Sequence, residues 1–301
     1  MPVDTVLRLR RVHRLRDRTR GGISHAACGR KPGNRRRPVR WRSGSRHAAD
    51  QQADRSRWLV RLRIAFSKHG KIRFTSHRDV ARIWERALRR TNLPVAYSEG
   101  FTPRPKLSFG LALSTGHESE GEYLDVDLDP EQGADLDLAG LTTHLSAQLP
   151  VGMTATGVVV VDRRMPSLQQ AVTSCTWQID VRDVDESTAQ TAVDAALAAD
   201  ELMITRERKG KEVTDDIRPL VFGLAVDQPI ENGVRLIAEL GTQPRAVRVT
   251  ELLSALDPPL AEPLLNEPRV LRVHQWITTD DGERHDPMSV AAAASAPVGV
   301  A

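Results

Sequence analysis

The feature that most constrains the fold is an ordered succession of strand-like and helix-like segments that starts near residue 58. The run WLVRLRIAF (58–66) alternates apolar and basic side chains. A period of two residues predicts a half-buried β-strand. A helix is expected next, because Ser76 and Asp79 form a capping-box-like start. An apolar stripe at helical spacing follows this start and comprises Val80, Ile83, Trp84, Ala87 and Leu88.

The other segments complete a repeated order of strands and helices. In the first half the sequence predicts strands at 72–74, 107–114, 122–129 and 151–161, and a helix at 133–147. In the second half it predicts strands at 174–183, 233–241 and 269–278, helices at 187–199 and 247–256, and a strand–turn–strand segment at 201–226. Each half follows a split βαβ order. We therefore expect an α+β fold with two ferredoxin-like halves and antiparallel sheets.

These segments divide the chain into four parts. Residues 1–56 are expected to be a disordered basic arm, because this stretch has almost no apolar periodicity. The alternative is an extension that lies upstream of the true start codon. The two predicted ferredoxin-like domains occupy residues 57–165 and 166–280. Residues 281–301 are low in complexity and are expected to form a flexible tail.

The net charge is distributed unevenly along the chain. Residues 1–57 hold 17 Lys and Arg against 4 Asp, a net charge of +13, and residues 58–301 hold 26 against 35 Asp and Glu, a net charge of −9. The isoelectric point of the whole chain is therefore no argument for nucleic-acid binding by the folded body. The arm itself could bind RNA or another polyanion. Within the body, residues 61–106 hold 12 Lys and Arg against 3 Asp and Glu, so the first domain is strongly polarised.

Cysteine content and hydropathy bear on the compartment. The two cysteines, Cys28 and Cys175, lie in different compositional regions and indicate no disulfide framework, which agrees with a reducing cytoplasm. No apolar run reaches the roughly 18 residues that a membrane-spanning helix needs. We therefore expect a cytoplasmic protein without a membrane partner.

The segment YSEGFTPRPKLSFG (97–110) predicts a rigid basic loop. Pro103 and Pro105 fix their own φ angles and bias Arg104 toward an extended backbone. Lys106 lies two residues further on and is expected on the same side. Two cations on a stiff backbone bind phosphate or carboxylate with a smaller entropic penalty. The alternative is edge protection, in which proline and charge prevent a strand from pairing with other chains.

Other basic residues form three further candidate anion sites. The first surrounds a turn and a helix N-terminus, where free N–H groups favour negative charge, and comprises Lys68, Lys71, Arg73, His77 and Arg78. The second is a helix stripe of Arg78, Arg82 and Arg86, and the third is a predicted hairpin turn with Arg208, Lys209 and Lys211. The alternatives are a solvated helix face, an exposed hairpin and, for His77, a plain surface position.

The sequence predicts no catalytic constellation. No Ser-His-Asp spacing, P-loop or dinucleotide fingerprint is present. Acidic residues between 118 and 129, together with His117, could be considered as metal ligands, but a closed metal site needs specific geometry. We therefore interpret Glu118, Glu120, Glu122, Asp125, Asp127 and Asp129 as solvated carboxylates, and we expect no metal and no cofactor.

Two segments carry a family resemblance. RIAFSKHGKIRFTSHRDVARIWERALRRTNLPVAYSEGFTPRPKLSFGLALSTGHESEGEYLDVDL (63–128) closely resembles the opening of the radical-SAM-linked protein family, a domain of unknown function. RKGKEVTDDIRPLV (208–221) also resembles a segment of that family, and the resemblance covers roughly residues 58 to 280. It implies a domain fused to, or encoded beside, a radical SAM enzyme. The chain lacks the CxxxCxxC motif of such enzymes, so it resembles the stand-alone form.

We therefore expect an accessory domain that presents a substrate, with RNA as the candidate ligand, and that works with a separate radical SAM enzyme. The resemblance carries no catalytic residues over to this chain. Two alternatives stay open. One is a stand-alone enzyme that acts on RNA, with His77 or His69 as general acid or base. The other is a protein-interaction module.

Overall fold

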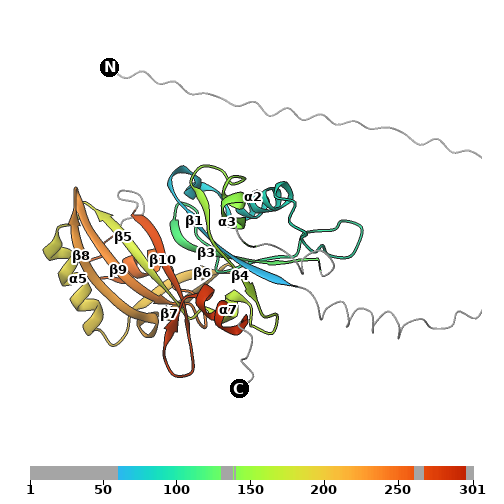
Figure 1. Ribbon diagram of the computed structural model, residues 1–301. Coiled ribbons are helices and arrows are strands. Elements are labelled where there is room, and N and C mark those ends of the chain that lie inside the picture. Colours follow the sequence, from blue (N-terminus) through green and yellow to red (C-terminus); the bar gives the residue numbers. More distant parts are fainter. Residues whose placement is uncertain (1–59, 130–137, 139, 261–267, 296–301) are drawn as a thin grey trace, which may run out of the picture. The chain divides into compact units, whose positions relative to one another are not determined.

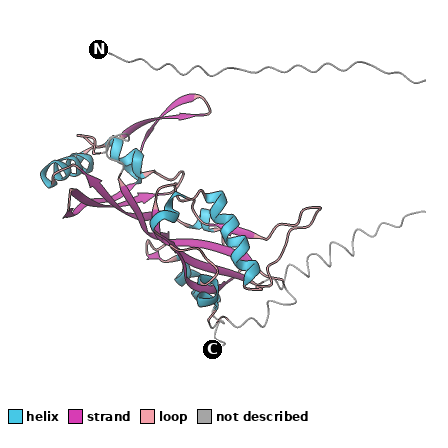
Figure 2. Cartoon of the chain, turned by 90° about the horizontal axis from the view of Figure 1, so that it is seen from above, coloured by secondary structure: helices cyan, strands magenta, loops and turns pink. Residues whose placement is uncertain are grey.

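The computed structural model describes residues 60–129, 138, 140–260 and 268–295, all within one compact unit (Figure 1). The expected α+β class is confirmed, since one large mixed sheet carries helices on its faces (Figure 2). The predicted arm at 1–56 lies outside the described residues. Among the described helices, none is long and apolar enough to span a bilayer.

The main sheet contains nine strands in the order β4-β1-β3-β10-β5-β9-β8, with β2 paired to β3 and β11 paired to β10. Neighbouring strands are antiparallel except β3 and β10, which are parallel. A separate hairpin consists of β6 (Met203–Arg208) and β7 (Lys211–Asp216). The strands of the main sheet are β1 (Arg61–Lys68), β2 (Leu107–Phe109), β3 (Glu118–Asp127), β4 (Met153–Val161), β5 (Ser174–Arg182), β8 (Val221–Ile230), β9 (Gly233–Gly241), β10 (Arg269–Thr278) and β11 (Arg284–His285).

The two halves of the chain share this sheet through a short parallel contact. Leu271 of β10 lies opposite Glu118 of β3, and Arg272 lies opposite Ser119. Every other pairing on the path joins strands of the same half. The sheet is therefore continuous across the position near residue 165 at which the sequence divides the chain.

The long helix of the first half begins where the sequence predicts. The Ser76 hydroxyl accepts a hydrogen bond from the Asp79 N–H at 3.3 Å, which satisfies one free donor of the first turn. Trp84 is buried against Phe66 of β1, with ring centroids 5.0 Å apart. The helices are α2 (His77–Arg90), α3 (Leu141–Ser146), α4 (Leu168–Ala171), α5 (Glu186–Ala198), α6 (Val249–Ala255) and α7 (Pro287–Ser295), with 3-10 turns η1 (Gly70–Phe74) and η2 (Arg218–Leu220).

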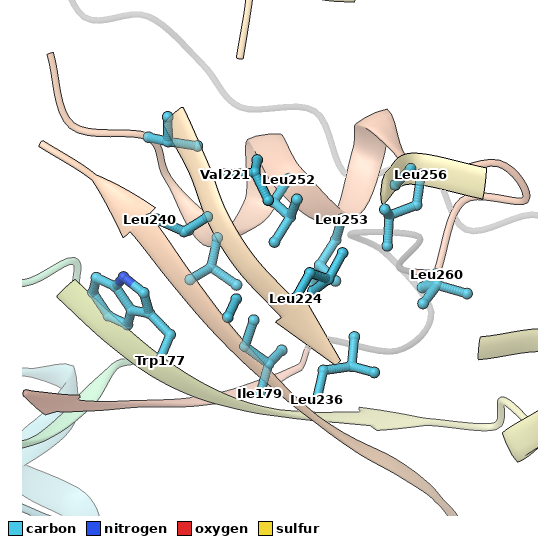
Figure 3. Packing of buried hydrophobic residues seen from close by; sticks show 14 of the residues in the cluster. Trp177, Ile179, Val221, Leu224, Leu236, Leu240, Leu252, Leu253, Leu256 and Leu260 are labelled. Carbon is cyan, nitrogen blue, oxygen red and sulfur yellow. The ribbon is translucent and has the colours of Figure 1, made fainter. Parts of the chain in front are cut away.

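The second half has its own hydrophobic core on one face of the sheet (Figure 3). Ile179 of β5 and Leu236 of β9 pack with Leu252 and Leu253 of α6. The small side chains of α5 complete this core, because four of its residues are buried: Ala189, Ala192, Val193 and Ala196. The predicted strands and helices of this half are present with bounds close to those expected, except at 201–226, where the structure has β6, β7 and the start of β8 instead of one strand, a turn and one strand.

The predicted strand at 72–74 is wrong, because these residues belong to the 3-10 turn η1. A return strand needs a free edge beside β1. Both edges of β1 are already paired, one to β3 and the other to β4. The chain instead turns at Gly70, whose φ of +69° suits glycine, and proceeds directly into α2.

Strand β1 is also buried on both faces, which corrects the expected half-buried strand. The basic side of the strand is covered by α7, and the Arg63 guanidinium donates to Asp125 at 2.8 and 3.0 Å and to the Pro287 carbonyl at 3.1 Å. Tyr123 donates to the Asp286 carboxylate at 2.7 Å just before α7. The flexible tail expected at 281–301 is therefore wrong for residues 287–295, and residues 296–301 lie outside the described residues.

A matched pair of substitutions tests whether α7 is part of the folded body. Ala291 is fully buried, whereas its neighbour Ala292 is exposed. Ala291→Glu should lower the free energy of unfolding by about 2–4 kcal/mol, because it buries an unpaired carboxylate. Ala292→Glu should change it by about 0.5 kcal/mol or less. Urea unfolding of both variants measures this difference, and equal small effects would show that the segment is a loose tail.

Candidate polyanion-binding surface

The basic loop is a closed hairpin-like extension at the end of β3. Its base is held by the bridge between Val95 and Leu128 and by the hydrogen bond from Lys106 N–H to the Ala96 carbonyl at 2.8 Å. Further out, the Ser98 N–H donates to the Arg104 carbonyl at 2.8 Å, and the Arg104 N–H donates to the Ser98 hydroxyl at 3.0 Å. Figure 1 shows the loop extending away from the sheet. The loop backbone is thus fixed by its own hydrogen bonds as well as by its prolines.

Residues 100–104 at the end of the loop are exposed. Gly100 has a φ of +126°, a backbone conformation that residues other than glycine rarely adopt. No atom lies within 4 Å of a Cβ placed there, so the turn itself, rather than a close neighbour, requires glycine. Arg104 and Lys106 are exposed, and no ion pair joins either side chain to another described residue. The loop therefore presents two cations to the solvent.

The α2 helix presents a second set of cations. Arg78, Arg82 and Arg86 are exposed, as the predicted stripe requires. Arg82 lies 3.0 Å from Asp79, but both side chains are about half exposed, and such a pair contributes little. Arg86 and Arg90 line a groove between α2 and the turn that leads into β4, together with Ile72, Ile83, Ala147, Gln148, Leu149 and Pro150.

The cluster expected at the first turn is only partly on the surface. Lys71 and His77 are exposed, and the Arg73 guanidinium stacks over the Phe74 ring at 4.7 Å. Lys68 is buried instead, and its ammonium donates to the Arg73 carbonyl at 3.2 Å and to the Thr75 carbonyl at 3.1 Å. Burial lowers the pKa of Lys68. Its inward position differs from the surface position that the sequence predicts.

The second basic turn is the tip of the β6–β7 hairpin. Lys209 and Lys211 are exposed, and Lys209 has a φ of +53° beside Gly210. Arg208 pairs with Lys211 across the hairpin, but its side chain lies outside the described part. The hairpin belongs to the second half of the chain, so the sequence-predicted cations occupy two separate regions of the sheet assembly.

The sequence does not reveal a buried polar junction between the halves. The guanidinium of Arg272 is buried, and it donates to the Glu122 carboxylate at 3.0 Å and to the Leu111 carbonyl at 2.9 Å. Arg269 donates to Glu118 at 2.8 Å. The expected solvated carboxylates are therefore wrong for Glu118, Glu122 and Asp125, which are buried and paired with arginine. Glu120 is exposed.

The groups around this junction have shifted pKa values. Burial, together with the nearby charges of Arg272 and Lys68, lowers the pKa of His117 to about 4. Burial raises the pKa of the Cys175 thiol to about 11. A cavity of about 20 Å³ between Lys68, His77 and Glu122 has room for about one water molecule. A pocket for a small-molecule substrate is usually at least ten times larger than this cavity.

Comparison with known proteins identifies a family for this chain, but that family has no described function. Residues 61–249, more than half of the chain, match the family described as an uncharacterized protein conserved in bacteria (DUF2344). No curated protein matches the chain. Within the described residues, no group of three or more His, Cys, Asp or Glu side chains is arranged to hold a metal ion.

The lowered pKa of His117 predicts a stability change in mild acid. The pKa rises from about 4 in the folded state to about 6.5 in the unfolded state, so the unfolded state binds the proton first as the pH falls. The contribution of His117 to the free energy of unfolding should be constant above about pH 7. It should fall by at most about 3 kcal/mol between pH 6.5 and 4. His117→Gln removes this titration. Urea unfolding at pH 7 and pH 5 should show a smaller loss for the variant, and an equal loss would contradict the assignment.

Proposed function

The chain belongs to the DUF2344 family of uncharacterized bacterial proteins, and we propose that it is an accessory domain that binds RNA and presents it to a separate radical SAM enzyme. The observation that carries the RNA part is the set of exposed cations on one stiff loop and one helix face. Arg104 and Lys106 on the loop and Arg78, Arg82 and Arg86 on α2 belong to this set. Exposed cations of this kind bind phosphates independently of sequence.

The stiffness of the loop supports the same proposal. The loop is closed by backbone hydrogen bonds at its base and contains Pro103 and Pro105. Arg104 therefore loses little backbone freedom when it meets a phosphate. The uneven charge distribution of the first half also favours this surface, since residues 61–106 hold nearly all of the lysines and arginines of that half.

The proposed enzyme partner follows from the resemblance to the radical-SAM-linked family. A radical SAM cluster needs three cysteines in a CxxxCxxC motif, and this sequence holds only Cys28 and Cys175. Cys175 is buried and its thiol pKa is raised, which disfavours the thiolate that a metal requires. A separate enzyme would then supply the reaction, and this chain would supply the binding surface.

The finer architecture is also a proposal: each half is a ferredoxin-like unit, at 57–165 and 166–280. Strand order supports it. In the first half, β1 and β2 are connected through α2 and are separated in the sheet by β3. In the second half, β5 and β8 are connected through α5 and are separated by β9. Both halves thus contain a split βαβ arrangement, and the β6–β7 hairpin is an insertion in the second.

Salt titration of RNA binding tests the loop directly. In the full chain, Arg104→Ala with Lys106→Ala should reduce the slope of log K against log salt by about 1 to 1.5, since each phosphate contact adds roughly 0.7. Pro103→Ala with Pro105→Ala keeps the charges, so it should weaken binding by about 1 kcal/mol or less at an unchanged slope. The basic arm is the same in every variant, so its contribution cancels in the comparison.

A matched control removes two exposed arginines elsewhere, as Arg164→Ala with Arg248→Ala. It changes the net charge equally and should leave the slope unchanged. Binding is measured between 50 and 300 mM salt. If the wild-type chain binds no RNA at low salt, the RNA proposal fails. If the Arg104 and Lys106 variant matches the wild type at every salt concentration, the loop serves edge protection instead.

The accessory role makes a separate prediction about catalysis. Purified alone, under anaerobic conditions with SAM and a reductant, the protein should form no 5′-deoxyadenosine above a no-protein control. The reason is that the sequence lacks the cluster motif needed to cleave SAM reductively. Chromatographic quantification of 5′-deoxyadenosine provides the measurement, and appreciable product would overturn the accessory role.

A further inference from the structure

Exposed aromatic side chains are concentrated in the part of the chain that carries the exposed cations. Among the described residues, four Phe and Tyr side chains are exposed: Phe74 (58%), Tyr97 (44%), Phe101 (110%) and Phe222 (56%). The first three lie within residues 61–106, and two of them lie on the basic loop itself. The loop therefore carries Tyr97 on its first arm, Phe101 at its end, and Arg104 and Lys106 on its second arm.

Phe101 has no role in folding that its surroundings reveal. Its exposure is that of a fully solvated side chain, at the end of a loop whose backbone is already hydrogen-bonded at its base. An exposed apolar ring loses the stabilisation that burial would give. The ring precedes Arg104 by three residues, and Tyr97 lies opposite Pro105 across the loop. A ligand that covers Phe101 and extends along the loop therefore meets the positive charges of Arg104 and Lys106.

From this arrangement we propose that the loop binds single-stranded RNA, with unpaired bases stacked on Phe101 and Tyr97 while Arg104 and Lys106 contact the adjacent phosphates. The inference deepens the proposed RNA-binding function and rests on it. An apolar protein surface would satisfy the rings but not the cations. A duplex would satisfy the cations, but its base faces are stacked inside the helix. A single strand offers π-faces and phosphates together.

A second exposed ring shows the same combination in this half of the chain. The Arg73 guanidinium lies 4.7 Å from the centroid of the Phe74 ring, and the ring remains more than half exposed. Arginine and aromatic planes both stack with bases. Phe74 is thus a second exposed ring beside a cation, but it lies near the start of β3, where the Gly116 N–H donates to the Arg73 carbonyl, whereas the loop pairs with the end of β3.

The test uses the full chain with three probes: a 12-nucleotide single-stranded RNA, the same strand annealed to its complement, and polyphosphate. Phe101→Ala should weaken binding of the single strand by about tenfold at an unchanged salt slope. Phe101→Leu should weaken it similarly, because leucine is apolar but has no π-face. Phe101→Trp should retain the affinity. Binding of the duplex and of polyphosphate should be unaffected by all three substitutions.

Phe222→Ala is the control, since Phe222 is a ring on β8 in the second half that is 56% exposed. It should bind every probe like the wild type. If the wild-type chain binds none of the probes, the proposed function fails and the inference fails with it. If RNA binding depends on Arg104 and Lys106 but not on Phe101, only the inference is overturned. Full affinity in Phe101→Leu would also overturn it, because the contact would then be apolar without stacking.

Discussion

The buried ion pair between Arg272 and Glu122 is the interaction on which the arrangement of the two halves depends. Strands β3 and β10 share only a short ladder, which by itself contributes few hydrogen bonds. Arg272 has 1% of its surface exposed, so removing its carboxylate partner would leave a buried, uncompensated charge. Gln275 adds a hydrogen bond to the Gly121 carbonyl at 2.6 Å. A shift in the register of β10 against β3 would separate Arg272 from Glu122 and Gln275 from the Gly121 carbonyl. These two contacts therefore favour one alignment of the two halves.

Strand β3 connects the junction between the halves to the basic loop. Its first residues form the junction, and its last residues pair with β2 and with the base of the loop. Between them, Asp125 is held by Arg63 and Asp127 by Arg61, at 2.7–2.8 Å. One strand therefore anchors the candidate binding surface at one end and the second half of the chain at the other. The loop that carries Arg104 and Lys106 is hydrogen-bonded at its base to the end of this strand.

Local sequence signals were sufficient for much of this architecture. The start of α2 follows from Ser76 and Asp79, and the presence of β3 follows from Leu124, Val126 and their neighbours, although both faces of this strand are buried. The ion pairs were not predictable in this way, because Arg272 and Glu122 are 150 residues apart. As charged residues, Arg272 and Glu122 would be expected from the sequence alone to lie in contact with solvent. The pairing partner, and hence burial, becomes visible only when the sheet brings β10 beside β3.

The same limitation explains the positions of Lys68 and of α7. Lys68 ends a strand that is paired on both edges, and its ammonium finds carbonyl acceptors in the turn that follows. A charged residue near a helix N-terminus looks like an anion ligand until that turn is known. Helix α7 contains a run of alanines with little amphipathic character, so no local pattern indicates which side is buried. The contacts of Arg63 and Tyr123 with the segment 286–287 determine it.

The composition of the loop bears differently on the proposed ligand-binding role and on edge protection. Protection of a strand edge needs charge and proline, both of which the loop has at Pro103 to Lys106. A fully exposed phenylalanine works against that purpose, because an apolar ring promotes the association that charge is meant to prevent. Gly100, with its φ of +126°, directly precedes Phe101. The proposed single-stranded ligand would use the charge, the rigidity and the exposed ring together, whereas edge protection accounts only for the charge and the prolines.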